Sequence, residues 1–272
     1  MKFKPFLFAS VLSIVQQVPL AAELFIDDKP REIALADKLE LNATIGGYPI
    51  WNGEGKWRLV ELIRNDSSGS AASIPLGTAR FFQTEGKQFV AGMEVRANLR
   101  PGSGYWIDEP CKRDDMLFKL QLSGGREDNC VTINHITRYM SNPGGKLAEA
   151  FALFKSQGIE VPPTVLNIVL TRNATSQRKL VFSIWINPEL AGFVRESEPE
   201  WGRNPWHKVQ AFSDPKKKQY IDALSVWATS FAKKMNDGLS QKADAYSDIP
   251  TWRSIQISAT QSEPQKTQVK LD

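Results

Sequence analysis

Apolar and polar residues alternate with a period of two along several stretches of the chain, which is the pattern of a β-strand with one face on a core. The clearest stretch is 88–99. One of its faces carries Phe89, Ala91, Met93, Val95, Ala97 and Leu99, and the other carries Gln88, Glu94, Arg96 and Asn98. Shorter runs at 56–64 and 78–84 predict two further strands.

A hairpin is predicted from two strands at 164–173 and 178–187, which a polar turn near residues 174–177 connects. Both strands are apolar at nearly every position instead of alternating. Strands of that kind are buried on both faces, so we expect this hairpin near the centre of a sheet.

One helix is predicted at 144–158, because glycines bound this stretch and Leu147, Phe151 and Phe154 recur at helical spacing. A longer helix is predicted at 215–238. Its apolar residues recur at steps of four, three, four and four, and they are Tyr220, Leu224, Trp227, Phe231 and Met235. A stripe of this kind packs on a core, and a coiled-coil partner is the alternative, although the pattern covers only two to three heptads.

Residues at both ends support the longer helix. Ser213 is predicted to be its N-cap, and Pro215 suits the first turn. Gly238 suits the C-terminal end.

The order of these elements, strands first and then a helix, a hairpin and a long helix, indicates an α+β fold. We expect a mainly antiparallel sheet packed with two main helices (about 146–157 and 215–238). Residues 23–256 are predicted to form a single domain, and the polar stretch 257–272 is predicted to be a disordered tail.

The first 22 residues have the layout of a secretory signal peptide. Lys2 and Lys4 precede an apolar run, and the small pair Ala21 and Ala22 ends the segment. We therefore expect cleavage near Ala22 and a soluble periplasmic or extracellular mature protein. A buried N-terminal helix is one alternative; a membrane anchor is another, but the run is shorter than the ~20 residues that a span needs.

Cys111 and Cys130 are the two cysteines of the chain. In an exported protein such a pair is most simply a disulfide. A metal site or a reactive thiol with His135 is the alternative. However, Cys130 and His135 lie an odd number of positions apart in a predicted strand at 130–140, so their side chains point to opposite faces. We expect His135 to be a core histidine.

A disulfide also constrains the segment between the cysteines. If 116–122 were a strand paired with 130–139 and the chain ran straight on, Cys111 would lie far beyond the reach of Cys130. A short helix covers less distance per residue. We therefore predict a helical or compact excursion over 112–122.

Charge and motifs exclude several functions. The chain has 34 Lys and Arg against 30 Asp and Glu, and removal of the leader takes away Lys2 and Lys4. A nucleic-acid binder concentrates a larger basic excess, so no nucleic-acid partner is expected. The sequence lacks the phosphate-binding, nucleophile-elbow and zinc-protease motifs. We therefore predict no cofactor, no metal and, on balance, no catalytic activity.

The segment 187–215 is the main candidate for function, because long loops of this kind are uncommon unless they are functional or disordered. Its candidate ligand-binding residues are Phe193, Trp201, Trp206, His207 and Phe212. Aromatic faces beside carboxylates can hold a sugar, a peptide or a cation. The plainer interpretation is that these rings fix the loop to the core.

Three hypotheses follow. The first is an exported, non-catalytic binding or envelope-accessory protein of unknown ligand and oligomeric state. The second is an exported hydrolase that uses His207 with one of three nearby carboxylates, Glu196, Glu198 and Glu200. The third is a structural protein that assembles through its C-terminal helix.

Overall fold

The computed structural model describes residues 22–31, 43–51, 53, 55–67, 74–101, 109–123, 129–137, 145–174, 178–196, 200–242 and 244–255. The predicted tail at 257–272 and all of the predicted leader except Ala22 lie outside the described residues. Within these ranges, no helix combines the length and the apolar character that crossing a membrane requires.

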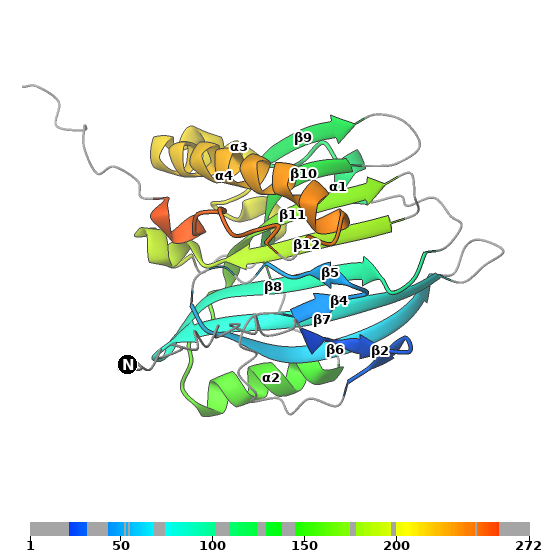
Figure 1. The fold of residues 1–272 in the computed structure, drawn as a ribbon. Coiled ribbons are helices and arrows are strands. Elements are labelled where there is room, and N and C mark those ends of the chain that lie inside the picture. Colours follow the sequence, from blue (N-terminus) through cyan, green and yellow to red (C-terminus); the bar gives the residue numbers. More distant parts are fainter. Residues whose placement is uncertain are drawn as a thin grey trace, which may run out of the picture.

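A seven-stranded antiparallel sheet forms the centre of the described structure, in the order β6-β7-β8-β12-β11-β10-β9 (Figure 1). Its strands are β6 (Trp57–Ser67), β7 (Ile74–Glu85), β8 (Gln88–Asn98), β9 (Phe118–Ser123), β10 (Asn129–Thr137), β11 (Thr164–Ala174) and β12 (Arg178–Ile186). The predicted strands and the predicted hairpin are therefore confirmed, and the hairpin β11–β12 lies centrally. Together with the helices, the sheet confirms the α+β class.

The helices cover opposite faces of this sheet. Helix α4 (Pro215–Leu239) lies beside β10, β11 and β12, whereas α2 (Gly145–Ser156) lies at the β6 end (Figure 1). Phe82 of β7 contacts Phe151 and Phe154 of α2, with ring centroids 5.4 Å apart in both cases. Its neighbour Phe81 belongs to the core under α4. Neighbouring strand residues point to opposite faces, so α2 and α4 lie on different sides.

The apolar stripe predicted for the long helix is buried in this core. All five residues of the stripe are no more than 5% exposed, namely Tyr220, Leu224, Trp227, Phe231 and Met235. The ring of Trp51 packs edge-on against Trp227 and Phe231, at 5.7 and 5.2 Å. An assembly through α4 would therefore need another of its faces.

The N-cap of α4 differs from the prediction. Asp214 occupies the cap, and its carboxylate accepts the backbone N–H groups of Lys216 and Lys217. Ser213 instead ends a short helix, α3 (Lys208–Ser213), and its hydroxyl donates to the carbonyl oxygen of Gln210. The sequence alone could not decide between Ser213 and Asp214 as the N-cap, because Ser and Asp are both favoured at this position.

Small β elements precede the large sheet. Strands β1 (Ala22–Glu23), β4 (Ala43–Ile45) and β5 (Tyr48–Pro49) form one sheet, and β2 (Phe25–Ile26) pairs with β3 (Lys29–Pro30). The Glu23 carboxylate accepts hydrogen bonds from the Thr44 hydroxyl and from the backbone N–H groups of Gly46 and Gly47. Both glycines have positive φ, so this carboxylate fixes a turn that needs glycine.

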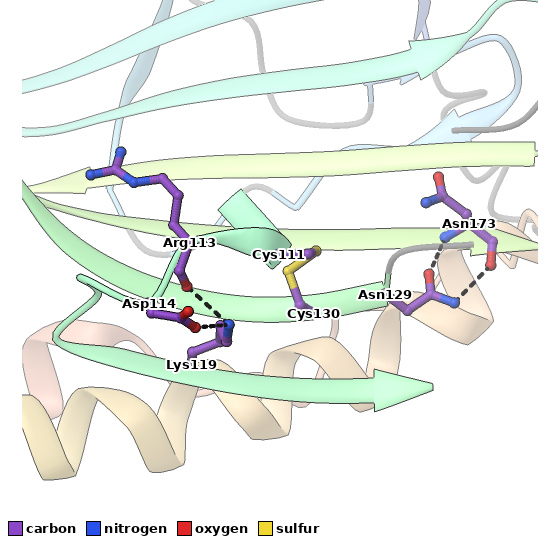
Figure 2. The surroundings of a disulfide bond; sticks show 7 residues. All are labelled: Cys111, Arg113, Asp114, Lys119, Asn129, Cys130 and Asn173. Atoms are coloured by element: carbon purple, nitrogen blue, oxygen red, sulfur yellow. Dashed lines mark hydrogen bonds and ion pairs between the residues drawn. A yellow bond between two sulfur atoms is a disulfide. The ribbon is translucent and has the colours of Figure 1, made fainter. Parts of the chain in front are cut away.

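The disulfide between Cys111 and Cys130 is confirmed, with the two Cα atoms 5.6 Å apart (Figure 2). Cys111 lies in α1 (Glu109–Lys112). Cys130 alternates along β10 with Val131, which faces the α4 core, so α1 lies on the face opposite α4.

The predicted helical or compact excursion over 112–122 is wrong for its second half, although residues 113–117 do form a compact reversal. Residues 118–123 are strand β9, in which Gln121 pairs with Cys130. The strand and the disulfide coexist because the chain reverses over 113–117. Lys119 closes this reversal by donating to the carbonyl oxygen of Arg113 and to the carboxylate of Asp114, at 2.9 and 2.8 Å (Figure 2). The prediction failed because it extended the strand straight on to Cys111.

Candidate functional site: a polar pocket at the open edge of the sheet

The candidate site lies where the outermost strand stops short of its neighbour. β9 pairs with β10 only as far as Ile133. Beyond that point Arg113, from the reversal after α1, and Trp201, from the short helix η2 (Trp201–Arg203), lie near the edge of β10. These elements enclose a cavity of about 200 Å³.

The floor of the pocket combines polar and apolar side chains of the sheet, and Ile136 and Val169 are its apolar members. It includes Thr132 and Asn134 from β10 and Asn167 from β11. Asn134 and Asn167 are cross-strand partners. The Ser183 hydroxyl donates to the Asn167 side-chain oxygen at 2.7 Å, and the indole N–H of Trp185 donates to Ser183 at 3.2 Å. Polar groups therefore run across three strands on this face.

The opposite face of the same strands is mainly apolar, with His135 and Thr164 at its β10 edge. It carries Val131, Ile133, Leu166, Ile168, Leu170, Leu180, Phe182, Ile184 and Ile186, all of which are buried in the core under α4. Buried polar side chains lose hydration, which costs free energy unless they find partners. On the pocket face, the Asn167, Ser183 and Trp185 side chains are partners of one another, which offsets part of this cost.

His135 forms one wall, and its ring lies between two oxygens, of which a neutral imidazole can donate to one. Its Nε2 lies 3.0 Å from the carbonyl oxygen of Trp201, and its Nδ1 lies 3.2 Å from the side-chain oxygen of Asn134. Both oxygens only accept. The Asn134 oxygen already accepts the backbone N–H of His135, so the shorter contact to Trp201 favours the ring proton on Nε2, and Nδ1 then makes no hydrogen bond to Asn134. Burial lowers the pKa of His135 to about 4, in spite of the hydrogen bond to Trp201. The side chain is thus a neutral core histidine, as predicted.

Trp201 is surrounded by side chains of the protein itself. His135 stacks on it with ring centroids 5.0 Å apart, and the ring of His207 meets it at 4.7 Å. The guanidinium of Arg113 lies 5.8 Å from its ring centre. With these contacts, Trp201 is a wall of the pocket instead of a free platform for stacking a ligand.

The charge of Arg113 is balanced inside the site. Its Nε and Nη2 donate to both carboxylate oxygens of Asp115, at 2.8 and 2.5 Å. These bonds lower the pKa of Asp115, so the acid stays ionised beside the guanidinium. The pocket therefore combines a compensated ion pair, neutral amides and hydroxyls, and a neutral imidazole.

Three of the five predicted ligand-binding residues lie elsewhere. Trp206 is fully buried, and its ring packs against Phe193 at 4.8 Å and beneath the ammonium group of Lys217 at 5.2 Å. Phe193 and Phe212 are partly buried and pack on the main core. The structure brings only Trp201 and His207 to the region of the pocket, where His207 lies 6.0 Å from His135.

The carboxylates that the hydrolase hypothesis needs have other partners. Glu196 forms an ion pair with Lys217 at 3.1 Å, and Glu200 with Arg203 at 3.4 Å. Nδ1 of His207 lies 3.0 Å from the side-chain oxygen of Gln210. Glu198 lies outside the described residues. Both cysteines are in the disulfide, and the described residues contain no cluster of three or more acidic, His or Cys side chains suited to a metal.

The sequence interpretation missed the pocket floor for a specific reason. The strands of the hairpin β11–β12 are apolar at nearly every position, and the prediction of a buried hairpin therefore gives no role to the exceptions Asn167 and Ser183. In β10, Thr132 and Asn134 share a face by alternation. The alternation of residues along β10 therefore indicates that Thr132 and Asn134 lie together. The register that pairs β10 with β11 could not be derived from one sequence.

Comparisons with known proteins add little. No family model and no curated protein matches the chain. Among solved structures, it is similar to the possible transcriptional regulator YydK from Bacillus subtilis, with 14% identity and a TM-score of 0.26. The match covers 52% of this chain and 61% of the regulator chain, less than two thirds of its length. A similarity this low carries no argument, so the function has to be argued from the site.

Proposed function

We propose that this chain is an exported, non-catalytic binding protein that holds a small, neutral, polar ligand in the pocket at the edge of β10. The observation that carries the proposal is the group of polar side chains among the apolar residues of the pocket floor. Thr132, Asn134 and Asn167 are directed to the side of the sheet that α4 does not cover. Ligand sites typically combine apolar walls with a few placed polar groups.

The chemistry of the lining favours a ligand without net charge. Arg113 is already neutralised by Asp115, and His135 is neutral above about pH 4. Amides and hydroxyls both donate and accept hydrogen bonds. They suit hydroxyl or amide groups on a ligand about as large as a monosaccharide, given a cavity of about 200 Å³.

Binding is tested by NMR titration of the mature protein with glucose and with N-acetylglucosamine as probes. We expect shifts centred on Thr132, Asn134 and Asn167 with at least one probe. The variant Asn167→Asp keeps an oxygen for the Ser183 hydroxyl and removes the amide donor. It should weaken that binding by about tenfold or more.

Ser230→Ala, on the exposed side of α4, serves as the control and should bind as the wild type does. The pocket assignment fails if neither probe shifts these resonances, or if Asn167→Asp binds equally well. Turnover of a probe would instead establish an enzyme.

Export is supported by the charged, apolar and small-residue pattern of 1–22 and by the disulfide. The intact mass of the secreted protein tests it. We expect the mass of 23–272 less two hydrogens, with no alkylation under non-reducing conditions. A full-length mass in the cell pellet would contradict export.

A further inference from the structure

A second cavity, distant in sequence from the pocket at β10, lies beside the short helix η3 (Trp252–Ser254). Its volume is about 230 Å³, and it shares no lining residue with the first pocket. The apolar part of its walls is formed by Leu190, Ala191, Trp252 and Ile255, together with the buried Tyr220. Glu85 and Arg253 are the charged residues of this lining.

Arg253 has only part of its hydrogen-bonding capacity in use. Its Nη1 donates to the Glu85 carboxylate at 2.5 Å. Its Nε and Nη2 are buried and have no hydrogen-bond partner among the residues that the structure describes. Leaving buried donors of a charged group unpaired is costly, so the protein accepts this cost at the edge of a cavity.

Arg80 of the same chain shows how a guanidinium is satisfied. Its Nη1 donates to Glu61 and its Nε donates to Glu94, at 2.5 and 2.6 Å. Arg253 repeats the first of these contacts with Glu85, whereas its Nε–Nη2 edge lacks the second carboxylate. Arg113 uses the same Nε–Nη2 edge to hold both carboxylate oxygens of Asp115, so this edge suits two parallel hydrogen bonds to a carboxylate.

We propose that the cavity at Arg253 binds a small carboxylate with an apolar body, the carboxylate lying on the Nε–Nη2 edge and the body between Ala191, Trp252 and Ile255. Arginine is a long, flexible side chain, so its fork can turn into the cavity that it already lines. An apolar cavity of about 150 Å³ holds benzene, and 230 Å³ therefore has room for a ring with its carboxylate. This site is independent of the proposed function at β10.

The test uses benzoate as the probe and its uncharged analogue benzamide as the chemical control. The probes are titrated into the mature protein and followed by the indole N–H resonance of Trp252. We expect saturable binding of benzoate, and binding of benzamide that is at least about tenfold weaker. Equal affinity for the two would overturn the proposal, as would the absence of saturable benzoate binding.

Variants locate the effect. Arg253→Gln should weaken benzoate binding by about tenfold or more, whereas Arg100→Gln, which removes an exposed guanidinium paired with Asp28, should leave it unchanged. Ala191→Leu fills the cavity without changing charge and should also abolish binding. It keeps the test decisive if Arg253→Gln does not fold. Benzoate binding that survives both changes, or that falls equally in Arg100→Gln, would refute the site.

Discussion

Trp201 and Trp206 of the segment 187–215 have different roles. Trp206 is fully buried between Phe193, Tyr220 and Lys217, whereas Trp201 is partly exposed at the pocket. Trp206→Ala should therefore lower the free energy of unfolding by about 3–5 kcal/mol. Trp201→Ala should cost clearly less, and urea denaturation measures both. Equal losses would show that Trp201 is also a core residue.

The buried imidazole of His135 makes stability depend on pH. Its pKa is about 4 in the folded protein and about 6.5 when unfolded. The unfolded chain therefore binds more protons between these values, and stability falls as the pH drops from 6.5 to 4. The loss approaches about 3 kcal/mol at the acid end of this range.

His135→Gln removes this titration, although it also changes the packing beside Trp201, Asn134 and His207. The relevant comparison is the slope of the unfolding free energy against pH, measured by urea denaturation from pH 7 to pH 5. We expect a flatter slope in the variant. Parallel slopes would mean that His135 titrates alike in both states.

At the scale of elements, the cap of α4 offers a matched pair of substitutions. Asp214 accepts two backbone N–H groups of the first turn, whereas the adjacent Ser213 hydroxyl bonds Gln210. Asp214→Ala should destabilise the protein by about 1 kcal/mol. Ser213→Ala should change it by less than about 0.5 kcal/mol. Thermal unfolding distinguishes them, and a larger effect at Ser213 would contradict the assignment.

The disulfide connects α1 to β10 and thereby sets the position of the Arg113 reversal. Replacing both cysteines by serine should lower stability by about 3 kcal/mol in the chain-entropy model. Reductant should bring the wild type to the same urea midpoint as the variant and leave the variant unchanged. A wild-type midpoint that does not respond to complete reduction would show that the bond contributes nothing.

Elements that local sequence pattern determines could be predicted, whereas those that depend on contacts further along the chain could not. Local periodicity was enough for α2, α4, β8 and the hairpin β11–β12. It failed at 118–122, where Lys119 closes a reversal through contacts five and six residues back. It also chose Ser213 over Asp214, since either residue can cap a helix. Local pattern fixes the type of an element better than its ends.

At the scale of the whole molecule, the pocket arises from a pairing that no local pattern reveals. Asn134 of β10 and Asn167 of β11 meet through the strand register, and Arg113 reaches the site because the disulfide holds α1 over the sheet. The candidate residues of 193–212 were chosen for their aromatic character, which core packing explains equally well. Which of them line the pocket depends on long-range pairing, so one sequence could not decide it.

The order of strands in the large sheet also bears on how the protein must fold. β6, β7 and β8 follow one another along the chain, but the free edge of β8 is covered only by β12. The backbone N–H of Lys179 donates to the side chain of Asn98, 81 residues away. Until β12 has been synthesised, the early three-stranded unit carries an open edge, and such edges recruit other chains. We therefore expect the nascent protein to be prone to aggregation at this edge until β12 pairs with β8.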